Sequence, residues 1–126
     1  MREIKFRALA QDTDIGLFEC YAIDFERRIA LHANGEWYDY IELNQYTGLK
    51  DKNGIEIYEK DNIKKPDFKT EKGKIIRPKA YEVIFESGGF HAKDGFHLSL
   101  CVKEYEVVGN TYEDPNLIQQ LGRMKR

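Results

Sequence analysis

The sequence predicts a mainly β protein (α+β at most), in which antiparallel strands form a small barrel or a two-sheet arrangement and one short helix closes the chain. Three observations predict it. Many short segments alternate apolar and polar residues, which is typical of half-buried strands. Turn signals separate them, among them Asn34-Gly35, Asn53-Gly54 and Asp94-Gly95. Eight Tyr and seven Phe also favour β structure.

The first strand is expected from Arg2 to Ala8, where apolar Ile4, Phe6 and Ala8 alternate with charged residues. A polar, Asp-rich loop follows at 11–16, and the segments 17–23 and 28–32 are predicted as two further strands. Asn34-Gly35 marks the next turn, and another strand follows from Trp37. This half of the chain is predicted to be entirely β.

A hairpin is predicted at Asn53-Gly54, the strongest local signal in the chain. A two-residue type I′ turn needs positive φ at both central positions, which Asn tolerates and Gly allows freely. Ile55 and Ile57 alternate with polar residues after the turn, so a strand is expected there.

The second half contains a basic segment, a meander and a helix. Residues 64–78 are predicted as an exposed loop with a short strand around Ile75-Ile76, because the segment is polar and contains two prolines. Residues 81–100 read as a three-stranded meander, and 102–108 as a strand. A helix of about two turns is expected from Asp114-Pro115 to Gly122, since Asp is a good N-cap and Pro suits the first helical position. The order of turn, basic loop and meander also suggests an SH3-like barrel in this half, by analogy of pattern alone.

Length and composition predict a soluble globular protein. At 126 residues, a single domain is expected, with the subdomain hypothesis 1–57 and 58–126. Cys20 and Cys101 lack metal or redox spacing, which favours free thiols in a reducing cytoplasm. Without an apolar leader or an apolar run of about 20 residues, neither secretion nor membrane spanning is expected.

Three segments of the chain carry a family resemblance. Residues 46–61 read Y-T-G-L-K-D-K-N-G-I-E-I-Y-E-K-D, the start reads R-E-I-K-F-R-A, and residues 109–117 read G-N-T-Y-E-D-P-N-L. Together they resemble the YopX family, small proteins of bacteriophages and prophages of Gram-positive bacteria. The resemblance implies a phage origin and a mostly β single YopX-like domain, and it implies no function, because the family's role is unassigned. One departure is Lys60, which stands where the family usually has Gly; an L-residue in a left-handed turn there would cost about 1–2 kcal/mol.

Charge is distributed unevenly along the chain. The formal net charge is −2, yet the segment 64–79 alone carries +5 and the remainder −7. Cations of this density can neutralise phosphates, with Phe68 or Tyr81 available to stack on bases. The same split would let a basic loop on one subunit meet an acidic surface on the next. The candidate nucleic-acid or partner contacts are Lys64, Lys65, Lys69, Lys72, Lys74, Arg77 and Lys79.

The sequence offers only weaker candidates for catalytic residues and metal ligands than for the basic contact residues. A two-residue hairpin closed at Lys93 and Phe96 would place His91 and His97 on opposite faces, which argues against a shared metal. Glu56, Glu59 and Asp61 could supply an acid and a base, but the first two favour opposite faces of a strand, and Asp61 suits capping a turn.

Neither cysteine has a catalytic-motif neighbourhood. We therefore assign no catalytic, cofactor-binding or metal residue and expect no cofactor.

Three functions are compared. The first is a non-catalytic, self-associating interaction module that also binds an unknown host or phage protein, motivated by charge asymmetry and abundant aromatic residues. The alternative is a nucleic-acid-binding accessory protein that uses the basic segment. A small hydrolase-type enzyme is the third.

Overall fold

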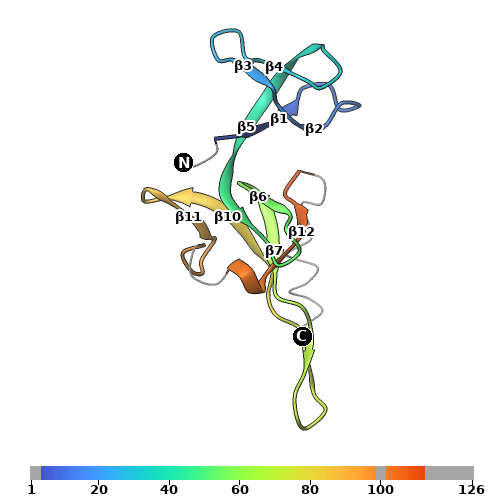
Figure 1. Cartoon of the computed structure of the whole chain (residues 1–126), viewed down its shortest axis with the longest axis vertical. Coiled ribbons are helices and arrows are strands. Elements are labelled where there is room, and N and C mark those ends of the chain that lie inside the picture. The colour runs from blue at the N-terminus through green and yellow to red at the C-terminus, as the bar shows by residue number, and fades with distance from the viewer. Residues whose placement is uncertain (1–3, 99–101, 113–126) are drawn as a thin grey trace. The chain divides into compact units, whose positions relative to one another are not determined.

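Antiparallel β-strands make up most of the chain. A computed structural model describes residues 4–98 and 102–112, shown in Figure 1. Their strands pair in three separate sheets, and one 3-10 turn, η1 (Val102–Glu104), accompanies them. The mainly β, antiparallel class is confirmed, as an arrangement of several small sheets without a closed barrel among the described strands. The helix predicted from Asp114 lies outside the described residues.

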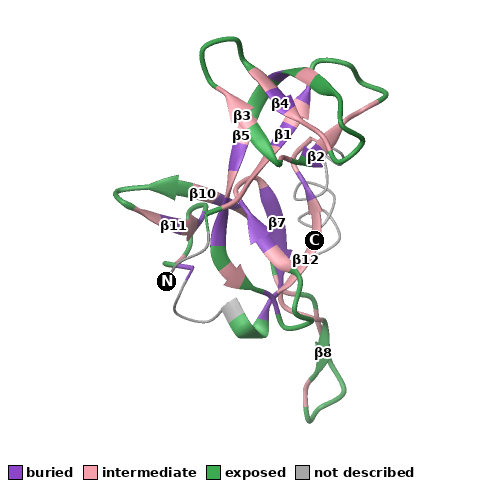
Figure 2. Ribbon diagram, turned by 45° about the horizontal axis from the view of Figure 1, so that its top comes forward, coloured by how far each residue is buried: buried purple, intermediate pink, exposed green. Residues whose placement is uncertain are grey.

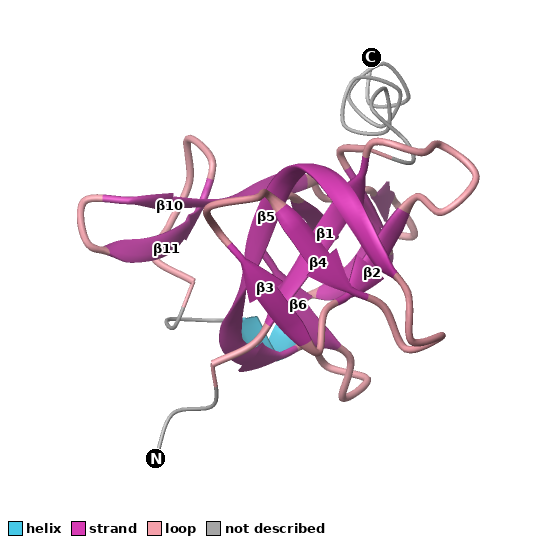
Figure 3. Cartoon of the chain, turned by 90° about the horizontal axis from the view of Figure 1, so that it is seen from above, coloured by secondary structure: helices cyan, strands magenta, loops and turns pink. Residues whose placement is uncertain are grey.

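The chain divides into two compact units, Met1–Gly48 and Leu49–Arg126, called unit 1 and unit 2 below. Unit 1 holds five strands in the spatial order β2-β1-β5-β4-β3, visible side by side as a curved sheet in Figure 3. Their bounds are β1 (Phe6–Ala10), β2 (Leu17–Glu19), β3 (Ala22–Asp24), β4 (Ile29–Leu31) and β5 (Trp37–Lys50).

The predicted strand 17–23 is in fact two strands. The Cys20 amide donates to the Phe6 carbonyl at 3.0 Å, whereas the Tyr21 amide donates to the Leu31 carbonyl at 3.0 Å. The chain thus changes partner from β1 to β4 between two consecutive residues, which the alternation of side chains does not signal.

Small residues and two aromatic side chains form the core of unit 1. Ala8, Ala10 and Ala30 are almost fully buried, and they pack with Phe18 and Tyr40. The alternation predicted for the first strand therefore identifies the buried face correctly at Ala8, although Ile4, at the start of that segment, is 71% exposed.

Unit 2 is built on a four-stranded sheet in the order β11-β10-β7-β12. The further strands are β6 (Glu56–Tyr58), β7 (Asp61–Lys64), β8 (Phe68–Lys69), β9 (Ile75–Ile76), β10 (Tyr81–Glu86), β11 (Gly89–Ala92) and β12 (Glu106–Asn110). β6 pairs with β5, and β8 pairs with β9. The core gathers apolar side chains from across this unit: Ile57, Ile63, Val83, Phe90, Leu98 and Tyr105.

The turn at Asn53-Gly54 has a different type from the one predicted. The Asp51 amide donates to the Ile55 carbonyl at 2.8 Å, so the loop contains three residues. Gly54 has φ +81°, and Asn53 does not have a positive φ. This is a type I turn followed by a left-handed Gly, the usual three-residue hairpin. The predicted bend is confirmed and the predicted type I′ turn is wrong.

Asp51 holds this turn together from inside. Its side chain is 6% exposed; Oδ1 accepts from the amides of Asn53 (2.8 Å) and Ile55 (2.9 Å), and Oδ2 accepts from the amide of Val107 (2.9 Å). A buried carboxylate is stable there because three backbone donors replace its hydration.

Lys60, where the resemblance leads one to expect Gly, adopts a left-handed conformation with φ +71°. Its amide donates to the Val83 carbonyl at 2.8 Å, and its carbonyl accepts from the Thr111 amide at 2.9 Å. Both hydrogen bonds fix the backbone, so Lys60 bears the strain and the local turn is kept.

The last strand begins later than predicted. Residues 102–104 form η1, and β12 spans Glu106–Asn110, so the predicted strand 102–108 is wrong in its first half. In the meander, β10 and β11 are confirmed, and a single bridge joins His91 to His97 in place of a third strand among the described residues.

Candidate functional site: the basic hairpin

The basic segment forms a hairpin of strands β8 and β9. The Thr70 amide donates to the Lys74 carbonyl at 2.8 Å, and Gly73 at the turn has φ +85°. The short strand predicted around Ile75-Ile76 is confirmed, and sequence reasoning missed its partner β8. In Figure 1 the hairpin extends away from the four-stranded sheet of unit 2, and in Figure 2 it is coloured mostly as exposed, whereas β7 within the sheet is buried.

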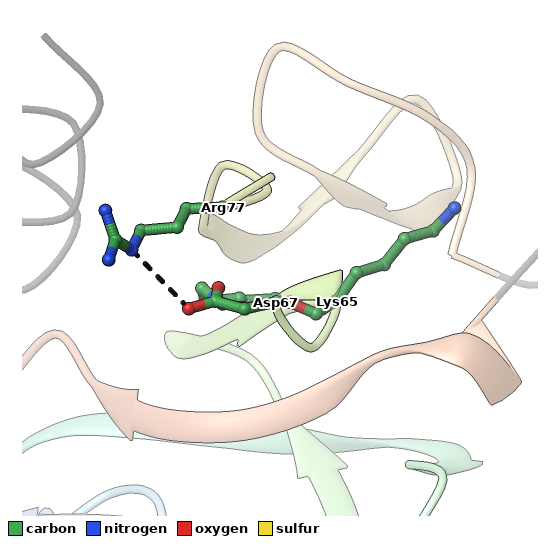
Figure 4. Close-up of polar contacts among 4 residues, drawn as sticks. Lys65, Asp67 and Arg77 are labelled. Atoms are coloured by element: carbon green, nitrogen blue, oxygen red, sulfur yellow. Dashed lines mark hydrogen bonds and ion pairs between the residues drawn. The ribbon is translucent and has the colours of Figure 1, made fainter. Parts of the chain in front are cut away.

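Two of the seven predicted contact cations are engaged by one carboxylate at the base of the hairpin. Lys64 is only 9% exposed, and its Nζ lies 2.7 Å from Asp67 Oδ1 and 2.9 Å from the Lys65 carbonyl oxygen. Arg77 Nε lies 3.7 Å from Asp67 Oδ2, the pair drawn in Figure 4. Asp67 therefore pairs with both cations and lowers the net positive charge at the base of the hairpin.

Two further cations pack on neighbouring side chains. Lys65 Nζ lies 3.2 Å from Glu104 Oε2 and 5.7 Å from the centre of the Tyr105 ring. Lys79 Nζ lies 5.3 Å from the centre of the Tyr81 ring. The first contact joins one leg of the hairpin to η1, and the second is local to the start of β10.

The remaining three cations, Lys69, Lys72 and Lys74, lie around the turn. They form no ion pair with any residue in the described ranges, and only Glu71 stands among them, which gives the tip a net charge of +2. The structure thus separates the seven predicted residues into four that contact neighbouring side chains at the base and three that lie around the tip.

Apolar side chains accompany these lysines. Phe68 is 52% exposed and Ile75 57% exposed. Phe68 pairs with Ile76 and Lys69 pairs with Ile75, so Phe68 and Ile75 lie on opposite faces of the hairpin. Each face of the hairpin therefore leaves a large apolar side chain about half exposed.

Unit 1 carries a surface of the opposite character. Its 48 residues include nine acidic and five basic residues, a net charge of −4. It also exposes five large apolar side chains: Ile4, Tyr21, Phe25, Trp37 and Ile41. Aromatic residues of this kind are enriched at protein interfaces.

The carboxylates considered as an acid and a base are Glu56, Glu59 and Asp61. Asp61 is 2% exposed and its Oδ2 accepts from the Tyr58 amide at 2.8 Å, which confirms the predicted cap of the turn. Glu56 and Glu59 are half-buried residues of the same segment. Asp61 therefore has a structural role.

Cys20 is a free, half-buried thiol. Burial, and secondarily the charge of Glu19, raise the pKa of this thiol from 9.0 to about 11. A nucleophilic cysteine needs the opposite shift. Cys101 lies outside the described residues.

His91 and His97 lie side by side, contrary to the prediction. The Ala92 amide donates to the Phe96 carbonyl at 2.9 Å, so the loop between them has three residues and not two. A change of one residue in register moves every side chain to the other face. The two imidazole centres are 4.8 Å apart. Over residues 4–98 and 102–112, no group of three or more His, Cys, Asp or Glu side chains is placed to hold a metal ion.

Within the described ranges, no helix has the length and apolar character needed to cross a membrane.

Comparison with known proteins assigns the chain to a family. The family model described as YopX protein matches residues 5–119. The chain belongs to the YopX family. A crystal structure of protein EF1440 from Enterococcus faecalis is similar in fold, with a TM-score of 0.66 and 23% identity over 94% of this chain and 99% of that one. No curated protein matches the chain.

In this YopX protein, the motif residues of the resemblance have structural roles. Asp51, Gly54 and Asp61 shape the two turns around β6, and the Asn110 side chain accepts from the Tyr112 amide at 3.0 Å. The motif therefore specifies turns of the fold, and the exposed hairpin lies outside it.

Proposed function

We propose that this YopX protein is a non-catalytic interaction module that self-associates through the β8–β9 hairpin. The observation that carries the proposal is the hairpin itself, which exposes Phe68 and Ile75 on opposite faces and has three lysines around its turn. A short hairpin with both faces uncovered gains stability when a partner covers them.

A second copy of the chain fits this element by charge and by composition. The tip has a net charge of +2 and unit 1 has −4, so the hairpin of one copy attracts unit 1 of the next. The exposed aromatic residues of unit 1 offer apolar surface to Phe68 and Ile75. An association of this kind is head-to-tail, and it forms a ring where the rotation closes and a filament where it does not.

The apolar contribution is open to measurement. Covering the exposed half of Phe68 or Ile75 contributes about 1 kcal/mol each, half of the value for burying a whole side chain. Replacing both with Ser is therefore expected to raise the dissociation constant between copies about 30-fold.

Sedimentation velocity over a concentration series tests this proposal. The wild-type chain is expected to associate, and the Phe68→Ser/Ile75→Ser variant is expected to require about 30-fold higher concentration. Phe85 is 55% exposed in the same unit, so Phe85→Ser is the matched control and leaves association unchanged. A strictly monomeric wild type, or equal effects of both variants, would contradict the proposal.

Nucleic-acid binding remains the second candidate, because the three tip lysines have no acidic partner among the described residues. Titration of labelled single- and double-stranded oligonucleotides at low salt tests it. Binding by the wild type that is lost on changing Lys69, Lys72, Lys74 and Arg77 to Glu would favour this function over self-association. Absence of binding removes it.

The biological setting is part of the same proposal. The family supports a phage or prophage origin, and the free thiol of Cys20 suits the reducing cytoplasm of a bacterial host. There the assembled module is proposed to bind a host or phage protein. Affinity capture from infected cells, with and without nuclease, distinguishes a protein partner from a nucleic acid.

A further inference from the structure

The pair His91 and His97 lies at a special position between neighbouring strands. The Ala92 amide donates to the Phe96 carbonyl at 2.9 Å, and the Leu98 amide donates to the Phe90 carbonyl at 2.9 Å. These bonds flank the bridge between the two histidines, which are therefore a non-hydrogen-bonded pair. Side chains at such positions are the closest cross-strand neighbours in an antiparallel ribbon.

The spacing of the imidazoles matches that of two ligands on one metal ion. A metal–nitrogen distance of about 2.0–2.1 Å places the ion roughly 3.2 Å from each ring centre. Two rings at tetrahedral angles then have centres about 5.2 Å apart, and two at right angles about 4.5 Å. The observed separation of 4.8 Å falls between these values.

His91 is already oriented as metal-binding histidines are. Its Nδ1 lies 3.1 Å from the Gly89 carbonyl oxygen, which can only accept, so Nδ1 carries the proton. Nε2 is left with a lone pair for a metal. Donation of the other ring N–H to a backbone carbonyl is the usual outer-shell arrangement of a histidine ligand.

Gly89 makes room for the second imidazole. A Cβ at this position would lie 2.8 Å from Nε2 of His97, closer than real side chains approach. His97 itself is exposed. Glu86 pairs with Gly89 and so lies on the same face as His91, where its negative charge favours a cation.

We propose that His91 and His97 form a binding site for a divalent transition-metal ion such as Zn²⁺ or Ni²⁺. The two imidazoles supply neighbouring ligands, and water completes the coordination. Because the site lies on β11 and the residues after it, and not on the β8–β9 hairpin, it is independent of the proposed self-association.

Isothermal titration with Zn²⁺ alone, and separately with Ni²⁺ alone, tests the site on the full chain. The wild type is expected to bind one ion, and His91→Gln and His97→Gln are each expected to weaken binding at least about tenfold. His32 packs between Phe18 and Tyr38 in unit 1, so His32→Gln is the control and keeps the wild-type affinity. Gly89→Ala keeps both histidines and is expected to weaken binding by displacing the His97 ring.

A second measurement needs no variant and so does not depend on their folding. In an NMR titration of the imidazole nitrogens with Zn²⁺, the signals of His91 and His97 are expected to shift together while those of His32 stay in place. Absence of saturable binding, binding that survives loss of either histidine, or equal shifts at His32 would overturn the proposal.

Discussion

Replacing Lys60 with Gly is expected to stabilise unit 2. Lys60 has φ +71°, a region that L-residues avoid because Cβ approaches the carbonyl oxygen. The backbone cannot leave this region, since the Lys60 amide donates to Val83 and its carbonyl accepts from both the amide and the hydroxyl of Thr111. Gly adopts the same conformation without the steric cost and keeps these hydrogen bonds.

The size of the gain follows from two opposing terms. The left-handed conformation costs an L-residue about 1–2 kcal/mol. Glycine returns part of this, because its unfolded chain has more freedom, at about 0.5–1 kcal/mol. The free energy of unfolding is therefore expected to rise by about 0.5–1 kcal/mol, or about 3 °C in melting temperature for a chain of this length.

Urea denaturation followed by circular dichroism measures this change. Lys60→Ala is the matched control, because alanine removes the long side chain but keeps the strained φ, so no gain is expected. Lys72 does not have a positive φ, and Lys72→Gly is expected to lower stability slightly. The reasoning is refuted if Lys60→Gly unfolds at the same or a lower urea concentration than Lys60→Ala.

Three further outcomes are expected from buried or paired groups. Asp51→Asn replaces a carboxylate that accepts from three backbone amides with an amide group that can accept through only one atom. Urea denaturation should show that the free energy of unfolding falls by about 3 kcal/mol. A fall below about 1 kcal/mol would contradict the assigned role. Asp67→Asn leaves the nearly buried ammonium of Lys64 without its charge partner and should lower the free energy of unfolding by about 1–2 kcal/mol. Glu104→Gln should lower it by less than about 0.5 kcal/mol, because the Glu104 side chain is 64% exposed. Equal losses in the two variants would refute this distinction. In a Cys101→Ser chain, alkylation of Cys20 should reach half its maximal rate near pH 11, because burial raises the pKa of the thiol to about 11. A midpoint near pH 9 would show that the thiol is not desolvated. Since the folded state holds this thiol neutral, its contribution to stability is present below pH 9 and is lost as the pH rises from 9 to 11.

Local patterns predicted which residues form turns and strands, because these depend on neighbouring residues. Gly35 and Gly54 occupy left-handed turn positions, and β4 and β10 fall where alternation placed them. The exact lengths of the hairpin loops were not predicted correctly from the sequence. At Asn53-Gly54 and Asp94-Gly95, the hydrogen bonds close a three-residue loop in place of two, a difference that composition does not encode.

At Asp94-Gly95, this difference of one residue determines whether the two neighbouring histidines lie on the same face. A two-residue loop separates His91 from His97, and a three-residue loop brings them to one face. In the basic segment, the sequence located the cations but could not show that Asp67 would bind Lys64 and Arg77. Such pairings depend on how the strands meet, so the sequence overestimated the charge that the hairpin offers.

The role of the hairpin between copies of the chain is tested most directly by zero-length carbodiimide cross-linking. Equal amounts of ¹⁴N- and ¹⁵N-labelled chains are mixed, so that peptides of mixed label report contacts between copies. The proposed assembly predicts mixed cross-links from Lys69, Lys72 or Lys74 to carboxylates of unit 1. Mixed cross-links that involve only lysines outside the hairpin, or none of mixed label, would contradict it.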